Sequence, residues 1–163
     1  MNDISKDHPE LVLNIAEKWL GKTAETDWIV KHSLRGLLKQ GNTRALLFFG
    51  FGNPANIAVE NLVLRPNPVK IGGDLFFQFE IKNEAASNKL RVEYAIHYVK
   101  KTGKTSRKVF KITENEYPSG ITKIERKQRF QDFTTRTHYP GGHHLEVLIN
   151  GVMKAEGEFE VEK

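Results

Sequence analysis

The sequence predicts an α+β fold, because the spacing of its apolar residues changes part-way along the chain. In roughly the first fifty residues they recur at intervals of three and four, as on helices. Beyond that stretch they alternate with polar residues, as in strands that bury one face. The change falls at Gly50–Pro54, where glycine and proline interrupt regular structure. We therefore expect a helical segment over residues 1–53 and a β-sandwich domain over residues 54–163.

The first expected helix starts near Pro9, since proline is tolerated in the first helical turn. Leu11, Ile15 and Trp19 recur at i, i+4 and i+8, which predicts one buried stripe that ends before Gly21.

The second expected helix covers the segment Asp27 to Lys39 and has two chemically different sides. The apolar side consists of Val30, Leu34, Leu37 and Leu38. The opposite side spans a sector of roughly 100° and suits phosphate groups; it consists of Trp28, Lys31, His32, Arg35 and Lys39. Gly41 then predicts the end of this helix, and Asn42 predicts the N-cap of a short helix over Thr43–Phe49. This helix-turn-helix pattern is typical of helical repeats.

Seven short strands are expected after the helices. Their predicted ranges are Val59–Leu64, Leu75–Ile81, Leu90–Tyr98, Lys108–Ile112, Ile121–Phe130, His144–Asn150 and Val152–Val161. Asn150-Gly151 is a strong signal for a type I′ hairpin turn. Strands of this length and spacing indicate a sandwich of immunoglobulin type, here without the cysteine pair.

The composition predicts a cytoplasmic protein without cofactors. The chain contains no cysteine, so disulfides and thiolate metal sites are excluded. The N-terminus lacks the apolar run of a signal peptide, and Ala45–Phe51 is too short to cross a membrane. We expect no metal site either, because His138, His143 and His144 cluster without acidic or thiol ligands close by in the sequence.

Positive charge is concentrated in one part of the chain. The net charge is +5, and the basic residues gather between Lys89 and Arg129, whereas Glu156–Glu162 is acidic. Such a distribution is typical of a surface that binds a polyanion. A solvated charged face without a partner would give a similar pattern.

Several motifs resemble one known family. They are Trp-x-Val-Lys-His-x-Leu-Arg from Trp28, Lys-x-Gly-Asn from Lys39, His97–Lys101, Gly103-Lys104, Lys108–Lys111, Thr134–Arg136, Tyr139–Gly141 and Asn150-Gly151. Their order and spacing resemble the last HEAT-like helical repeat and the immunoglobulin-like domain of AlkC-type DNA-alkylation-repair glycosylases. The resemblance implies removal of N3-methylated bases from duplex DNA. It also implies that the main catalytic carboxylates lie on upstream repeats, whereas 163 residues leave room for about one and a half repeats.

Any catalytic role within the chain falls on Asp27 and Trp28. Base removal needs a carboxylate, and an aromatic ring favours a cationic base. Asp27 has an alternative role at the N-terminus of its helix, and Trp28 has one in packing. Whether the chain is an enzyme is therefore left open.

DNA contacts are expected from cations on both segments, because the motif matches the family at the helix and a hairpin loop is expected in the sandwich. The candidates are Lys31, His32, Arg35, Lys39, Lys100, Lys101, Lys104, Arg107 and Lys108. His32 has an alternative role as a hydrogen-bond donor to a neighbouring carbonyl group.

Three functions remain open from the sequence. The first is a DNA-binding C-terminal portion of an alkylation-repair protein that does not excise bases alone. The second is a complete small glycosylase, and the third is an immunoglobulin-like protein-interaction module with an incidental basic surface. Because two helices cannot bury all of their apolar residues, the N-terminal helices are expected to contact upstream repeats or a second copy of the chain.

Overall fold

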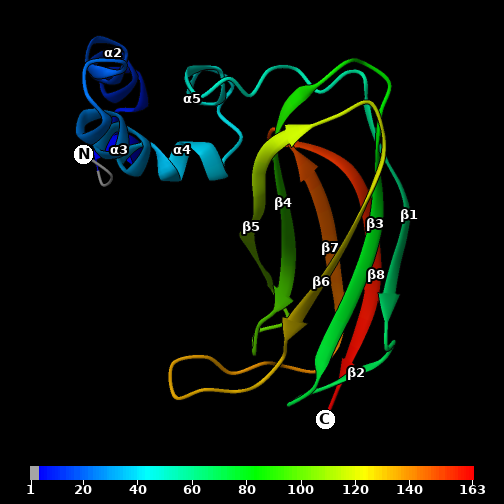
Figure 1. Cartoon of the computed structure of the whole chain (residues 1–163). Coiled ribbons are helices and arrows are strands. Elements are labelled where there is room, and N and C mark those ends of the chain that lie inside the picture. The colour runs from blue at the N-terminus through cyan, green and yellow to red at the C-terminus, as the bar shows by residue number, and fades with distance from the viewer. Residues whose placement is uncertain (1–3) are drawn as a thin grey trace. The chain divides into compact units, whose positions relative to one another are not determined.

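The computed structural model describes residues 4–163 and contains two compact units. The helical unit comprises residues up to Asn53 together with Asn150–Val152. The sandwich unit comprises Pro54–Ile149 and Met153–Lys163. The expected α+β fold class is confirmed, with the helices N-terminal to the immunoglobulin-like sandwich (Figure 1).

The helical unit contains five helices among the described residues. They are α1 (Ile4–Asp7), α2 (Pro9–Trp19), α3 (Ala24–Ser33), α4 (Arg35–Lys39) and α5 (Thr43–Phe48). The predicted N-cap of α5 is confirmed, since the Asn42 side chain accepts a hydrogen bond from the Ala45 backbone N–H at 3.0 Å. The predicted apolar side of the second helical segment is confirmed, because Val30, Leu34, Leu37 and Leu38 are all buried.

The predicted buried stripe on the first helix is wrong. α2 buries Val12, Leu13 and Ala16, whereas Leu11 and Trp19 are 55% and 41% exposed. Both sets have helical spacing, so the sequence pattern alone could not decide between them. The consequence is an apolar side of α2 that the helical unit leaves in solvent.

The predicted single helix from Asp27 to Lys39 is interrupted at Leu34. Leu34 has φ −88° and ψ 1°, outside the helical range, and α4 runs in a different direction from α3 (Figure 1). Just before the break, the Ser33 hydroxyl donates a hydrogen bond to the Ile29 carbonyl at 2.8 Å. Such side-chain bonds compete with the helical backbone bonds and often bend helices. Arg35 and Lys39 therefore do not continue the side of α3 that carries Lys31 and His32.

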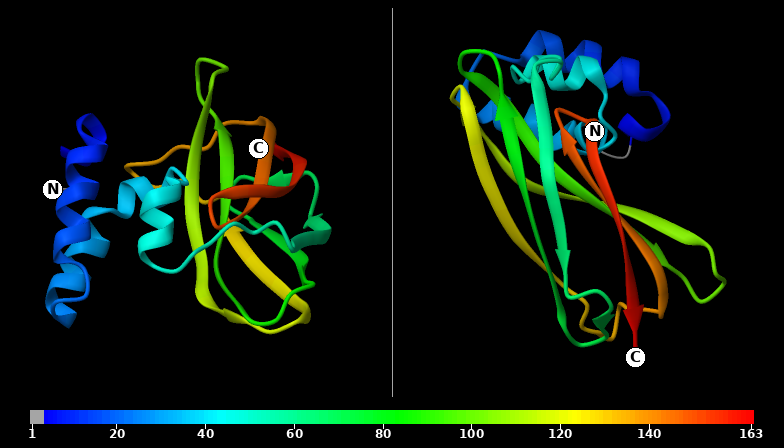
Figure 2. Two further views of the ribbon diagram at one scale, coloured as in Figure 1. Left: turned by 90° about the horizontal axis from the view of Figure 1, so that it is seen from above. Right: turned by 90° about the vertical axis from the view of Figure 1, so that its right-hand side faces the viewer.

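The sandwich unit contains eight strands in two sheets (Figure 2). They are β1 (Ile57–Arg65), β2 (Val69–Lys70), β3 (Asp74–Asn83), β4 (Asn88–Val99), β5 (Thr105–Tyr117), β6 (Gly120–Arg129), β7 (Gly141–Ile149) and β8 (Val152–Glu162). One sheet has the order β1-β3-β6, and the other has the order β2-β8-β7-β4-β5.

The seven predicted strands are present, and β2 is an additional one. β2 has only two residues and pairs in parallel with β8, which is too short to produce a period in the sequence. β5 is longer than predicted, because its second half is polar and only partly covered. Asn150 and Gly151 both have positive φ, at 48° and 78°, as a type I′ turn requires.

The core of the sandwich lies between the inner faces of the two sheets. Phe77 of β3 and Tyr94 of β4 meet there with their ring centroids 4.8 Å apart. β4 differs from an ordinary strand, because it is buried from Leu90 to Ile96 without interruption. A register shift between Val92 and Glu93 marks the same part of the strand.

None of the helices within residues 4–163 combines the length and apolar character needed to cross a membrane.

Substitution of Gly151 tests the turn between β7 and β8. A Cβ at this position would lie 2.6 Å from the Cα of Gly41, so Gly151→Ala adds a backbone clash to the strain of a positive φ. Gly103→Ala is the matched control, since Gly103 also has φ +78° but faces open space. In urea denaturation we expect Gly103→Ala to lower the free energy of unfolding by about 1–2 kcal/mol. Gly151→Ala should cost about 1–3 kcal/mol more, and equal losses would contradict this account of the turn.

Candidate nucleic-acid interface

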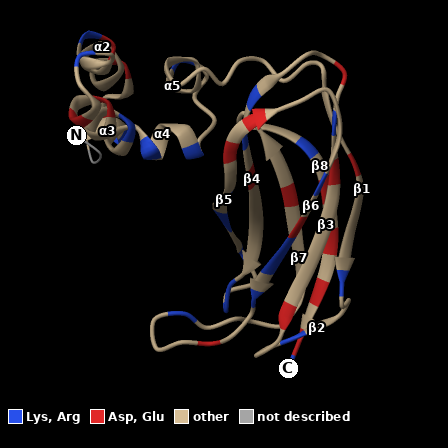
Figure 3. Ribbon diagram, viewed as in Figure 1, with Lys and Arg blue, Asp and Glu red and all other residues tan. Residues whose placement is uncertain are grey.

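The turn between β4 and β5 carries a group of exposed lysines. Lys100, Lys101 and Lys104 lie in it, and the turn is closed by the bond from the Lys100 N–H to the Lys104 carbonyl at 2.8 Å. Within residues 4–163, no acidic side chain forms an ion pair with any of them. Figure 3 shows the basic residues at this turn and along β5 and β6. The positive charge of the three turn lysines is therefore available to an anion from solvent.

Arg107 and Lys108, the other candidates on the sandwich, have partners within the protein. Arg107 donates from Nε and Nη2 to one carboxylate oxygen of Glu146, at 3.0 and 2.8 Å. The Lys108 ammonium lies 5.4 Å from the ring centre of Phe110. A phosphate would have to compete with these contacts.

Many of the cations on β6 are also compensated. Lys127 lies 3.2 Å from Asp74 and Arg129 lies 3.5 Å from the same carboxylate. Lys123 is paired with Glu125 at 2.9 Å. Within the basic run that the sequence shows, these three β6 cations thus have an acidic partner that the lysines of the β4–β5 turn lack among the described residues.

The DNA-binding candidates of the helical unit also differ in how far they are exposed to solvent. Lys31 is half-buried, with its ammonium 5.4 Å from the ring centre of Phe49. His32 is exposed and its ring stacks on that of Trp28, with centroids 5.3 Å apart and planes 13° from parallel. Arg35 and Lys39 are exposed on α4.

The two catalytic candidates have very different surroundings. The Asp27 carboxylate accepts a hydrogen bond of 2.7 Å from the Gly21 N–H and so closes the turn between α2 and α3. Trp28 is 68% exposed, so it is not a packing residue of the helical core. Trp28 and Ile29 line a shallow hollow together with Ala24 and Glu25.

Strand pairing brings together two histidines that are distant in the sequence. His97 of β4 lies directly opposite His144 of β7, and their ring centroids are 5.2 Å apart. His97 Nε2 is 2.7 Å from Glu146 Oε1, and His144 Nε2 is 2.9 Å from Glu156 Oε2. The premise that His144 lacks acidic neighbours is therefore wrong. Glu146 is only two residues away, but His97 and Glu156 become neighbours through strand pairing.

Glu146 is held in its ionised form by this arrangement. Burial opposes its ionisation, but the hydrogen bonds from Arg107 and His97 outweigh that effect and lower the pKa of the carboxyl below its ordinary value.

His138 and His143 are both buried, with 5% and 2% of their surfaces exposed. Asp132 accepts hydrogen bonds from the backbone N–H and Nδ1 of His138, at 2.7 and 3.0 Å. Burial lowers the pKa of His143. These rings pack around Phe130 and have a structural role.

Comparison with known proteins identifies the family. The sequence model of the family described as "Uncharacterised protein YhaZ, C-terminal Ig-like domain" matches residues 58–163. The chain belongs to this family. It is 45% identical to protein YhaZ of Bacillus subtilis (strain 168) over 162 residues, which cover 99% of the chain and 45% of YhaZ.

The expected similarity to AlkC is confirmed by a solved structure. The alkylpurine DNA glycosylase AlkC of Pseudomonas fluorescens, bound to DNA containing an abasic site analog, is 43% identical with a TM-score of 0.94. The match covers 99% of this chain and 46% of AlkC. This member of the YhaZ family thus spans less than half the length of both relatives. A β-glucosidase from Listeria innocua shares the fold alone, with 16% identity, a TM-score of 0.55, and coverage of 69% of this chain and 17% of the enzyme.

Proposed function

We propose that this chain is the DNA-binding C-terminal portion of a DNA alkylation repair protein and does not release damaged bases alone. The observation that carries the proposal is the 43% identity to an alkylpurine DNA glycosylase along nearly the whole chain. That glycosylase was captured on DNA containing an abasic site analog, which supports DNA as the partner here, and we propose the duplex form.

The exposed lysines of the β4–β5 turn support a role in phosphate binding. Lys100, Lys101 and Lys104 carry three positive charges within five residues. Lysines of this kind contact the DNA backbone and contribute affinity without sequence preference. Arg35 and Lys39 on α4 are the corresponding candidates in the helical unit, since both side chains are exposed.

The non-catalytic part of the proposal is supported by the two catalytic candidates. Asp27 already accepts a hydrogen bond that closes a turn, and Trp28 lines an open hollow. We propose that base excision depends on residues in the part of the relatives that this chain does not cover. A cytoplasmic location stays a prediction of the sequence.

We further propose that the helical unit is a HEAT-like repeat that contacts another helical surface. Leu11, Trp19, Trp28 and Ile29 are all more than 40% exposed, and large apolar side chains at this exposure are typical of contact surfaces. Upstream repeats or a second copy of the chain would cover them.

DNA binding can be measured by fluorescence anisotropy on short duplexes over a range of salt concentrations. We expect weak binding without sequence preference. Log affinity should fall linearly with log salt concentration, and each phosphate contact should contribute about 0.9 to the magnitude of the slope. The triple variant K100Q/K101Q/K104Q should bind more weakly and show a shallower slope.

The matched control is K123Q/K127Q/R129Q, which removes the same charge from cations that have acidic partners. Equal losses in both triple variants would mean that net charge alone acts. Absence of binding at low salt would instead favour the protein-interaction module.

Base excision can be measured by chromatography of free bases released from methylated DNA. We expect the chain to release no more N3-methyladenine than buffer does. Release that disappears on Asp27→Asn would support the complete small glycosylase and contradict the proposal.

The contact surface of the helices can be tested by sedimentation velocity at micromolar concentrations. We expect self-association of the isolated chain, and expect Leu11→Lys with Trp19→Lys to abolish it, because burial of each large apolar side chain contributes about 1.5–3 kcal/mol. A strictly monomeric chain whose helices resist proteolysis would contradict the need for a contact partner.

A further inference from the structure

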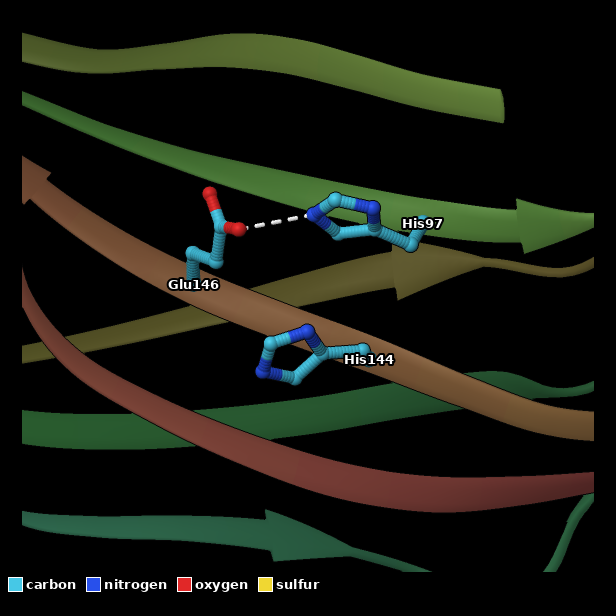
Figure 4. Close-up of side chains that lie close together, drawn as sticks. All are labelled: His97, His144 and Glu146. Carbon is cyan, nitrogen blue, oxygen red and sulfur yellow. Dashed lines mark hydrogen bonds and ion pairs between the residues drawn. The ribbon is translucent and has the colours of Figure 1, made fainter. Parts of the chain in front are cut away.

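One face of the five-stranded sheet brings together imidazole and carboxylate groups from neighbouring strands. His144 and Glu146 are two residues apart on β7, so their side chains point to the same face of the sheet. His97 lies directly opposite His144 on β4. Figure 4 shows the three side chains grouped together, with the dashed line joining His97 to Glu146.

The spacing of these groups fits a single small cation. His97, His144 and Glu146 each place one potential ligand atom within 4.8 Å of the other two. All three are partly covered by the protein, with side chains 25%, 30% and 13% exposed. The site is thus open enough for an ion to enter and covered enough to limit competition from water.

We propose that His97, His144 and Glu146 bind a divalent transition metal ion of the zinc class. Two imidazole nitrogens and one carboxylate oxygen form a donor set that zinc accepts with a water molecule in the remaining position. Magnesium and calcium prefer oxygen donors, so two imidazoles select against them. The ion would take the place of the proton between His97 Nε2 and Glu146 Oε1, which are 2.7 Å apart, and that proton would be released to solvent.

The neighbouring residues support the ligands. Arg107 donates two hydrogen bonds to Glu146 Oε2, so it fixes the carboxylate while Oε1 faces His97. Such outer contacts orient metal ligands. Glu156 of β8 lies 2.9 Å from His144 Nε2 and brings a second carboxylate to the cluster. Its charge balances part of the charge of the incoming ion.

A bound ion would add a coordinate cross-link between two strands whose side chains are already joined by the hydrogen bond of His97 to Glu146. The ligands come from β4 and β7, which are adjacent in the sheet. In a chain without cysteine, a metal ion is a chemically available cross-link between them.

Isothermal titration of the full chain with zinc chloride tests the proposal directly. We expect saturable binding of about one ion per chain, because the cluster offers a single set of ligands. His97→Gln and His144→Gln should each weaken binding by about 100-fold or more, since loss of even an outer contact costs about 10–100-fold. His8→Gln is the matched control, because His8 is exposed and lies in the helical unit; it should bind zinc like the unmodified chain.

Cobalt(II) provides a second test that needs no substitution. Bound cobalt should give the strong visible absorption of a four-coordinate site, and zinc should displace it. No saturable binding of zinc, a pale six-coordinate cobalt spectrum, or undiminished zinc binding in both glutamine variants would each overturn the proposal.

Discussion

The packing of the two sheets against each other is the interaction on which the sandwich depends. Aromatic and aliphatic side chains from β3, β4 and β7 meet between the sheets, with Phe77 against Tyr94 as one direct contact. Because side chains alternate along a strand, fixing the inward residues also fixes which residues point outward. Burial of Leu145 and Val147 thereby places His144 and Glu146 together on the opposite face of β7. A shift of one residue in this strand would bury the histidine and expose the leucine.

The sequence predicted the elements well where one periodic pattern dominated. The alternation in β3 and the Asn150-Gly151 turn both identified structure that is present. The pattern failed on α2, because apolar residues with helical spacing lie on two sides and only tertiary contacts select the buried one. It also failed at Leu34, where the helix is interrupted beside the hydrogen bond from the Ser33 hydroxyl to the Ile29 carbonyl although the apolar face stays buried.

The candidate sites show the same limit. A list of cations could not reveal that Arg107 is held by Glu146 and that Lys127 lies beside Asp74, because these partners are distant in the sequence. Nor could it reveal the meeting of His97 with His144, which requires the register of β4 and β7. Clusters formed by strand pairing are invisible to motif spacing, whereas the lysines of the β4–β5 turn are adjacent in the sequence and were found.

Charge on this protein therefore has two roles. Buried Arg91 pairs with Glu93 at 2.6 Å, and removing one partner of such a pair leaves an uncompensated charge in the interior. Lysines of the β4–β5 turn have the opposite environment, since water surrounds them. The first kind of charge specifies structure, and the second remains available for an external anion.

The Asn150–Val152 turn belongs to the helical unit although the strands on either side belong to the sandwich unit. Asn150 donates a hydrogen bond to the Gly52 carbonyl at 2.9 Å, across 98 positions of the sequence. On the ribosome, the helices emerge long before this turn exists. At about 5–20 residues per second, translation of the intervening segment takes roughly 5–20 s. During that interval the nascent helices lack one of their own structural elements, so the helical unit is completed only when synthesis of the chain is nearly finished.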